Sequence, residues 1–278
     1  MSRTWFITGV SSGFGLLMAT KLLERGDTVA GTSRKPEAAA ALKSRFPERF
    51  WSADLDLTDG DNIERTIVRA FDELGKIDVI VSNAGYGLFG ALEGLSAAQI
   101  DDQIAANLVG PIRLTKAVAP FLRRQGGGRI IAISTYGGQA THAGASLYHA
   151  SKWGLEGFME TMSQELAAFN IGVTIVEPGG ARTGFRDAAR TNLGARLDAY
   201  QGTPAGMVHD ILSDPSRLPI GDPEKMVNLM LASVDIDPAP RRLVLGSDAY
   251  KAISAALSFR SAEVDAQKDT ASLSDLSG

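Results

Sequence analysis

The feature that most constrains the fold is a regular alternation between two kinds of segment. Short runs rich in β-branched and aromatic residues alternate with longer segments whose apolar residues recur at helical spacing, and no internal repeat interrupts the pattern. Helices of this length suit crossovers between parallel strands, and such crossovers are right-handed. The sequence therefore predicts an α/β fold: a doubly wound, Rossmann-like parallel sheet of seven strands.

The elements can be placed approximately along the chain. The expected strands are 4–8, 28–33, 50–56, 79–83, 129–134, 173–177 and 242–246. The expected helices include 13–25, 59–74, 97–122, 147–169, 223–233 and 249–262. Between the sixth strand and the helix at 223 the chain is rich in Gly, Pro, Arg and Asp. We expect residues 184–221 to form an excursion that covers the substrate.

Length and composition fit a single domain over residues 1–278. The chain is 44% hydrophobic and 22% charged, as in ordinary globular proteins. No apolar run reaches the roughly 20 residues of a membrane span, and no export signal is recognised, so we expect a cytoplasmic protein without a membrane partner. Residues 263–278 are polar and are expected to be a frayed tail.

Composition also excludes several kinds of chemistry and partner. The absence of cysteine rules out disulfides, thiolate metal ligands and a cysteine nucleophile. The net charge of −4 comes with scattered basic residues, which argues against a nucleic-acid partner. His142, His149 and His209 do not form a ligand cluster, so they are interpreted as structural and no metal site is predicted.

A glycine-rich segment, "TGVSSGFG", follows the first expected strand and opens the first helix. Gly9 would permit a tight turn, Gly13 a close approach to a pyrophosphate, and Gly15 close packing of helix on strand. The helix N-terminus would then face the phosphates. The alternative is that the glycines serve the turn alone.

The segment "GTSRKP" after the second strand bears on cofactor choice. Ser33 stands where an NAD enzyme places an acid for the ribose hydroxyls, and Arg34 and Lys35 follow it. A guanidinium would bind a 2′-phosphate, so NADP is favoured over NAD. The alternative is that Arg34 is a solvated loop cation. After the third strand, Asp56 and Leu57 could contact the adenine, although either aspartate of "DLTD" could cap the next helix.

Several motifs in order resemble the short-chain dehydrogenase/reductase family, in its compact branch. They are "TGVSSGFG", "DLTD", "SNAG", "NLVG", "YHASK" and "EPGGART", and the resemblance runs from Thr4 to about Gly246. It implies an NADP-dependent oxidoreductase that transfers a hydride between the cofactor and a carbonyl or secondary alcohol. The alternatives are a catalytically weak NADP-binding sensor or structural protein on the same fold, and a lyase or epimerase.

The resemblance assigns the catalytic roles. Tyr148 matches the family's general acid/base and Lys152 the residue that also binds the nicotinamide ribose. Residues four apart share a helix face, and a nearby cation favours phenolate, so we expect Lys152 to lower the pKa of Tyr148. A Tyr and Lys at this spacing could otherwise be a surface pair. Asn107 matches the asparagine that holds a water on the proton path.

The substrate-orienting hydroxyl departs from the family pattern. This position, thirteen residues before the tyrosine, is normally serine, and here it is Thr135. Threonine keeps the donor but restricts the rotamer and narrows the site. Ser134 should point to the other side of the strand. The alternative is that the Thr135 hydroxyl only satisfies a loop amide.

The resemblance completes the cofactor site. Asn83 to Gly85 would lie beside the adenosine ribose, Pro178 and Gly179 would bind the carboxamide through backbone groups, and Thr183 would bind that amide or the pyrophosphate. The full expected cofactor set is Gly9, Ser11, Ser12, Gly13, Phe14, Gly15, Ser33, Arg34, Asp56, Leu57, Asn83, Ala84, Gly85, Tyr148, Lys152, Pro178, Gly179 and Thr183.

The substrate is constrained only in broad terms. Its site should be walled by 136–146, 86–91 and 184–220, whose side chains suggest an apolar or aromatic carbonyl compound, unless they only pack the excursion onto the body. Hydroxysteroid-like substrates and general ketones or aldehydes both remain open. By resemblance, the partners are this small molecule and further copies of the chain in a homodimer or homotetramer, paired through the helices at 97–122 and 147–169.

Overall fold

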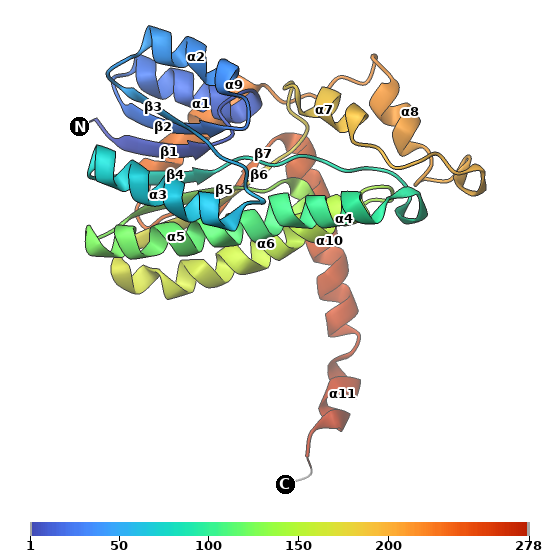
Figure 1. Cartoon of the computed structure of the whole chain (residues 1–278). Coiled ribbons are helices and arrows are strands. Elements are labelled where there is room, and N and C mark those ends of the chain that lie inside the picture. The colour runs from blue at the N-terminus through green and yellow to red at the C-terminus, as the bar shows by residue number, and fades with distance from the viewer. Residues whose placement is uncertain (1, 277–278) are drawn as a thin grey trace.

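The computed structural model describes residues 2–276 and contains one seven-stranded sheet. All strand pairs are parallel, and the strand order is β3-β2-β1-β4-β5-β6-β7 (Figure 1). The strands are β1 (Thr4–Thr8), β2 (Thr28–Ser33), β3 (Phe50–Asp54), β4 (Val79–Ser82), β5 (Gly128–Ile133), β6 (Ile171–Pro178) and β7 (Arg242–Leu245). The predicted single-domain α/β fold is confirmed, with each expected strand present and its ends within two residues of the prediction.

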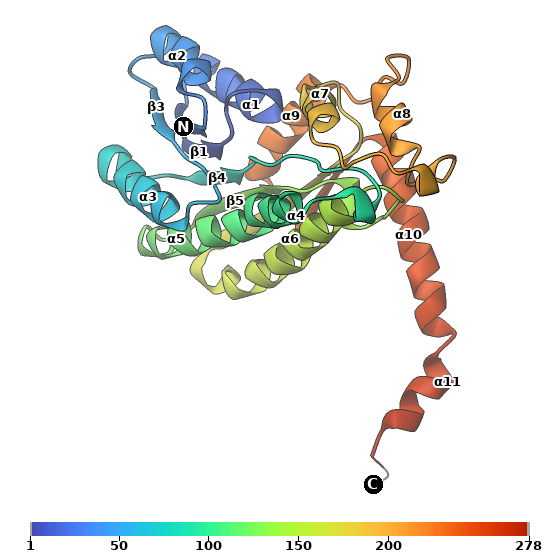
Figure 2. The same cartoon turned by 45° about the vertical axis from the view of Figure 1, so that its right-hand side comes forward.

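Helices cover both faces of the sheet. The described helices are α1 (Gly13–Glu24), α2 (Pro36–Arg45), α3 (Gly60–Leu74), α4 (Ala97–Ile104), α5 (Gly110–Arg124), α6 (Ser146–Glu165), α7 (Phe185–Thr191), α8 (Val208–Ser213), α9 (Pro223–Ala232), α10 (Ser247–Asp265) and α11 (Lys268–Ala271). Helices α1 and α9 lie on one face, and α3, α5 and α6 on the other (Figures 1 and 2).

Alternation along each strand divides the core into two layers. In β1, Trp5 and Ile7 pack with α1 and α9, whereas Phe6 packs with α3, α5 and α6. The same alternation in β5 sends Ile131 to the first layer and Ile130 to the second. Successive strand side chains point to opposite faces, so strands buried on both sides read as continuous apolar runs. The two layers fix the orientation of the carboxyl ends of the strands.

The single helix expected over 97–122 is interrupted. A π-helical turn at Ala105–Val109 separates α4 from α5. The proline at Pro111 has no N–H to donate to the carbonyl oxygen of Asn107, and the Gly110 amide bonds instead to Ala105. Asn107 therefore stands in the widened turn, which is a position that sequence periodicity does not reveal.

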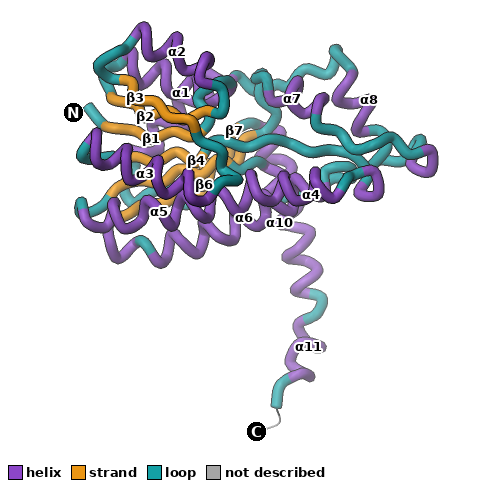
Figure 3. The backbone as a smooth tube through the Cα atoms, viewed as in Figure 1, coloured by secondary structure: helices purple, strands orange, loops and turns teal. Residues whose placement is uncertain are grey.

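The segment 184–221 forms an excursion beyond the carboxyl ends of the strands, and most of it is loop (Figure 3). It carries α7, α8 and a 3₁₀ turn at Asp198–Tyr200. Its two ends are joined by a bridge between Ala181 and Gly221. A second bridge, between Phe89 and Leu193, ties it to the loop after β4. The excursion is therefore anchored at both its base and its middle.

The C-terminal segment differs from the frayed tail expected at 263–278. Helix α10 continues to Asp265, and α11 and a 3₁₀ turn at Ser272–Ser274 follow. The chain leaves the body of the molecule as an arm (Figures 1 and 3). Its side chains from 261 to 276 are exposed, so local helix propensity and not packing accounts for its structure. The last two residues of the expected tail lie outside the described residues. In the described chain, no helix combines the length and apolar character that a membrane crossing requires.

Candidate active site

The glycine-rich segment forms the turn between β1 and α1. Gly9 and Gly13 have φ angles of 76° and 57°, a backbone region that glycine adopts without strain. A Cβ atom on Gly15 would overlap the carbonyl oxygen of Gly9. Gly9 thus makes the predicted turn and Gly15 the predicted close packing. Gly13 favours glycine because of its left-handed conformation, and its approach to a pyrophosphate stays a prediction.

The N-terminus of α1 offers a site for an anion. Ser12 is the N-cap residue, and its side chain makes no capping bond. Within residues 2–276, the amides of Ser12, Gly13 and Phe14 donate to no protein acceptor. A Cβ on Gly13 would lie 3.9 Å from the Cβ of Thr183, so the segment after β6 lies opposite the turn. Free amides at a helix N-terminus fit the pyrophosphate of a dinucleotide.

The loops after β1 and β4 are locked together. The hydroxyl of Thr8 accepts hydrogen bonds from the amides of Asn83 and Ala84, at 2.9 and 3.0 Å. The side-chain amide of Asn83 donates to the carbonyl oxygens of Thr8 and Gly9, at 2.8 and 3.1 Å. The Asn83 side chain thus holds the dinucleotide turn in place. The amides of Asn83 and Ala84 are both committed to Thr8, and the expected place of this segment beside the ribose stays a prediction.

The adenosine end carries the expected cation. The side chain of Arg34 is 72% exposed, and its guanidinium lies 4.0 Å from the Asp56 carboxylate, too long for a tight ion pair. The Ser33 hydroxyl accepts from the Lys35 amide at 2.9 Å. Arg34 is therefore held near this end of the site while its donors are largely uncommitted.

Asp56 and Leu57 are more constrained than expected. Asp56 accepts from the amide and hydroxyl of Thr58, at 2.9 and 2.8 Å. Although burial acts to raise it, the net pKa of Asp56 is lowered by these bonds and by the charge of Arg34. Leu57 is buried, and the cap of α3 is Asp59, which accepts from the Asn62 amide at 3.0 Å. Asp56 is therefore not the helix cap and keeps an oxygen facing Arg34.

Tyr148 lies between two aromatic rings. The rings of Phe89 and Phe185 have centroids 5.5 and 5.8 Å from that of Tyr148. One comes from the loop after β4 and the other from the excursion, and Tyr148 is only 9% exposed. Phe185 of the excursion and Phe89 thus make the surroundings of the phenol apolar, while the expected covering of a substrate by the excursion stays a prediction.

Burial decides the protonation of the phenol. Desolvation raises the pKa of Tyr148 above its usual value, and the Thr135 hydroxyl offsets only part of the rise. Lys152 is not among the groups that offset the rise in this structure, and its expected effect on the phenol stays a prediction. The Lys152 ammonium donates instead to the carbonyl oxygen of Ile133, at 2.8 Å. At neutral pH the phenol carries its proton.

Lys152 and Asn107 meet around Gly85. A Cβ on Gly85 would lie 3.1 Å from Asn107 Oδ1 and 3.7 Å from Lys152 Nζ, so only glycine leaves room there. Asn107 is fully buried and binds both backbone groups of Tyr86: it donates to the carbonyl oxygen at 2.7 Å and accepts from the amide at 3.1 Å. Burial lowers the pKa of Lys152 to about 8, although the charge of Glu156 opposes this.

Thr135 lies at the end of β5, beside the end of β6. Its hydroxyl donates to the carbonyl oxygen of Pro178 at 3.4 Å and accepts from the Gly137 amide at 3.3 Å. The next residue, Gly179, donates its amide to the carbonyl oxygen of Leu245 in β7. The Thr183 hydroxyl accepts from the Phe185 amide at 3.3 Å. The Thr135 hydroxyl therefore does accept from a loop amide, as the alternative reading proposed. It also lies close enough to the Tyr148 phenol to affect the pKa of that phenol.

Two contacts of the site were not anticipated from the sequence. The carbonyl oxygen of Ile133 fixes Lys152, and the backbone of Tyr86 fixes Asn107. Backbone atoms carry no residue-specific signal, so no motif could have identified them. His149 packs edge-on against His142, with centroids 4.5 Å apart, and burial lowers its pKa to about 4, as befits a neutral structural side chain. Within the described chain no group of side chains could hold a metal ion.

Comparison with known proteins agrees with this geometry. A family model described as short chain dehydrogenase matches residues 3–194. The chain belongs to the short-chain dehydrogenase family. It is 36% identical over 252 residues, 90% of this chain and 91% of the relative, to oxidoreductase BOA17 of Botryotinia fuckeliana. It is 38% identical over 181 residues, 65% of each chain, to a 3-ketodihydrosphingosine reductase of Bacteroides thetaiotaomicron.

A solved structure extends the likeness to the whole chain. The crystal structure of a short-chain dehydrogenase from Streptomyces avermitilis superimposes with a TM-score of 0.90 at 33% identity, covering 99% of this chain and 100% of that one. The protein is thus an oxidoreductase of this family that uses a nicotinamide cofactor, and the dinucleotide turn and the α1 amides are where such a cofactor fits.

A substitution at Gly15 tests the dinucleotide turn. Gly15→Ala should weaken nicotinamide-nucleotide binding at least about tenfold, because the new methyl group must displace the Gly9 carbonyl that shapes the turn. Gly157→Ala in α6 is the matched control, since its Cβ would meet nothing within 4 Å. Calorimetric titration of both variants decides, and equal affinities would contradict the role given to Gly15.

Proposed function

We propose that the protein reduces an apolar or aromatic ketone or aldehyde with NADPH, and that Tyr148 donates the proton. The observation that carries the proposal is the burial of the Tyr148 phenol between two phenylalanine rings, on the helix whose next turn holds Lys152. When bound, the nicotinamide supplies the hydride to the carbonyl carbon. The Tyr148 phenol supplies the proton to the carbonyl oxygen, and the product is an alcohol.

The protonation state favours reduction. A phenol whose pKa is raised is a good reservoir for the proton that the developing alkoxide needs, and a poor base for the reverse reaction at neutral pH. After transfer, the phenolate lies one helical turn from the Lys152 ammonium, which would stabilise it. Asn107 and Gly85 lie beside that ammonium and would hold a proton path toward solvent. The proton used in each turnover is thus replaced.

Thr135 would orient the substrate. Its hydroxyl lies close enough to the phenol to affect its pKa, so both donors could converge on one carbonyl oxygen once the Thr135 O–H turns away from the Pro178 carbonyl oxygen, to which it donates at 3.4 Å. The methyl group that distinguishes Thr from Ser restricts the side chain to fewer rotamers. A fixed second donor would hold the carbonyl for attack by the hydride.

The preference for NADP is supported by charge at the adenosine end. Arg34 is exposed and weakly paired, and no acidic residue stands at the end of β2 to repel a 2′-phosphate. Asp56 lies 4.0 Å away and would hold the guanidinium in place. A planar guanidinium suits bidentate binding of phosphate.

The apolar character of the substrate is supported by the closed excursion. Phe89, Ala145, Ala189 and Val208 form one buried cluster with Tyr148. The similar protein from Bacteroides is named a 3-ketodihydrosphingosine reductase, and this name gives a keto compound as its substrate. A panel of apolar, aromatic and polar carbonyl compounds, followed at the NADPH absorbance, tests the proposal. Turnover is expected with apolar members, while cofactor binding without any turnover would favour a binding protein.

Tyr148→Phe removes the proton donor and leaves the ring in place. We expect kcat for reduction to fall about 10²–10⁴-fold, with NADPH affinity within a few-fold of the parent. The exposed Tyr250 on α10 provides the control, because Tyr250→Phe should change neither quantity. A Tyr148→Phe enzyme that kept a tenth of the parent rate would rule out the proposed acid.

Variants of Thr135 test the second donor. Thr135→Ser keeps the hydroxyl and should preserve or raise kcat, whereas the isosteric Thr135→Val should lower it about 10²–10³-fold. The measurement is steady-state reduction of the best substrate of the panel. Similar rates for the three proteins would show that no hydroxyl is needed at this position.

Arg34 variants test the choice of cofactor. Loss of a charged hydrogen bond of about 1.5–3 kcal/mol should lower the ratio of kcat/KM for NADPH over NADH about 10–100-fold in Arg34→Asp. Arg34→Ala should give a smaller change, because it removes the cation without adding a charge that repels phosphate. If the ratio stayed constant in both variants, the 2′-phosphate would have to be recognised elsewhere.

A further inference from the structure

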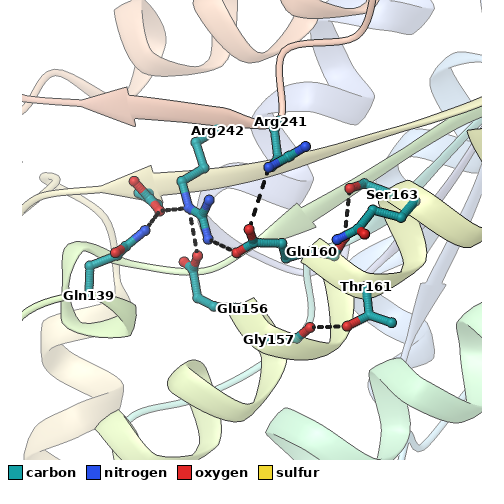
Figure 4. Close-up of polar contacts among 10 residues, drawn as sticks. Gln139, Glu156, Gly157, Glu160, Thr161, Ser163, Arg241 and Arg242 are labelled. Atoms are coloured by element: carbon teal, nitrogen blue, oxygen red, sulfur yellow. Dashed lines mark hydrogen bonds and ion pairs between the residues drawn. The ribbon is translucent and has the colours of Figure 1, made fainter. Parts of the chain in front are cut away.

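A buried cluster of acidic side chains lies directly behind the proposed active site. Glu156 of α6 and Glu177 of β6 both accept from the same Arg242 Nε atom, at 3.3 and 3.1 Å (Figure 4). Their exposures are 4% and 0%. Glu160 accepts from the other end of the Arg242 guanidinium at 2.7 Å and lies 3.5 Å from Arg241.

The buried carboxylates of the cluster have more oxygens than the Arg242 guanidinium can serve with hydrogen bonds. One Nε–H cannot serve two carboxylates fully, and the other guanidinium contacts belong to Glu160. Within residues 2–276, Glu156 Oε1, Glu177 Oε2 and the Ser134 hydroxyl oxygen have no hydrogen-bond partner of good geometry. Two buried carboxylates with unpaired oxygens are costly unless a proton is shared between them.

Each part of the cluster adjoins a residue of the active site. Glu156 lies one helical turn after Lys152, and Glu177 directly precedes Pro178, whose carbonyl oxygen accepts from Thr135. Ser134 directly precedes Thr135 in the chain. A change of charge at Glu156 is therefore one helical turn from Lys152, and a change of position at Glu177 or Ser134 is one or two residues from a group that contacts or includes Thr135.

The turn after Thr135 rests on the same cluster. Gln139 donates to Glu177 Oε1 at 2.9 Å. A Cβ on Gly138 would lie 2.7 Å from the Ser134 hydroxyl oxygen and 2.8 Å from Glu156 Oε1, so only glycine fits between the turn and the carboxyl group. From the opposite side, Arg260 of α10 donates to the Gln139 carbonyl oxygen at 2.5 Å. The turn is thus clamped between the cluster and α10.

We propose that Glu156 is a positioning residue that acts through Lys152: it shares a proton with Glu177 under the control of Arg242, and its charge sets the pH range over which Lys152 is a cation. The groups that face Glu156 are Lys152 and Glu160 on α6, Ser134 after β5, Glu177 on β6 and Arg242 on β7. The importance of this control for turnover rests on the proposed function, whereas the coupling itself does not.

The protonation behaviour of the three groups is consistent with this role. Burial, together with the charge of Glu177, raises the pKa of Glu156 to about 7. The pKa of Lys152 is about 8, and the charge of Glu156 acts to raise it. As pH rises through 7, Glu156 therefore becomes an anion, and this anion delays the loss of the Lys152 proton.

The coupling can be measured without substrate. The Lys152 signal of ¹³C-lysine-labelled protein, assigned with Lys152→Arg, is followed from pH 5 to 10 by NMR. In Glu156→Gln the midpoint for Lys152 should fall by about one pH unit or more, since a unit charge a turn away is removed. Glu160→Gln is the matched control. Glu160 contacts the same guanidinium, but its side chain is 37% exposed and lies two helical turns from Lys152. In this variant the midpoint for Lys152 should therefore stay within about 0.3 pH units of the wild-type value.

The wild-type protein provides a test that needs no variant. Its Lys152 signal should show a first small inflection near pH 7, where Glu156 ionises, before its own titration near pH 8. A single transition in wild type, or an unchanged midpoint in folded Glu156→Gln, would overturn the proposal. Glu156→Asp keeps the charge and should return the midpoint toward that of wild type.

The pH profile of kcat/KM for reduction separates this proposal from the proposed function. The alkaline limb should move to lower pH in Glu156→Gln. The two enzymes should converge below about pH 6, where wild-type Glu156 is protonated and as neutral as the Gln side chain of the variant. A pH-independent loss would indicate a merely structural role and would contradict the proposal. A shifted Lys152 midpoint in a protein that reduces no carbonyl compound would retain the coupling and reject the proposed function.

Discussion

The hydrogen bond from the Lys152 ammonium to the carbonyl oxygen of Ile133 fixes the centre of the molecule. It ties the helix that carries Tyr148 to the carboxyl end of β5, at 2.8 Å and away from solvent. A buried cation needs such partners, because desolvation otherwise removes its charge. Thr135, two residues beyond Ile133, is thereby brought beside Tyr148. The apolar side chains of α6, Leu155 and Met159 among them, pack the helix against the sheet, and this bond adds a polar contact one turn from Tyr148.

Most of the fold follows from local patterns. Strands such as β1 and β2 are apolar runs that glycine and polar residues bound, and their parallel order follows from crossover helices of ordinary length. The π-helical turn around Asn107 could not be predicted from the sequence, although the sequence contains Pro111. A proline predicts that a helix is disturbed, but it does not predict which turn takes up the extra residue. The helical arm after α10 was missed because polar composition does not distinguish a frayed end from an exposed helix.

The candidate site was predictable where glycine or a motif position carries the function. Gly9 and Gly15 satisfy the turn and the close packing that their spacing already indicated. The direction of the Tyr148 pKa shift was not predictable, since it depends on Phe89 and Phe185, which reach the phenol from distant segments. Local spacing places a cation near the tyrosine, but only tertiary packing determines how much water surrounds it.

The central claim is that a protonated Tyr148 meets the carbonyl oxygen where the hydride arrives. The measurement that tests it most directly is a crystal structure of the protein with NADP and an unreactive carbonyl analogue. The account predicts a Tyr148 Oη to carbonyl oxygen distance of about 2.6–3.2 Å, with the nicotinamide C4 about 3–3.5 Å from the carbonyl carbon. A phenol turned away from the ligand oxygen, or a nicotinamide bound outside the space between Gly85 and Tyr148, would contradict it.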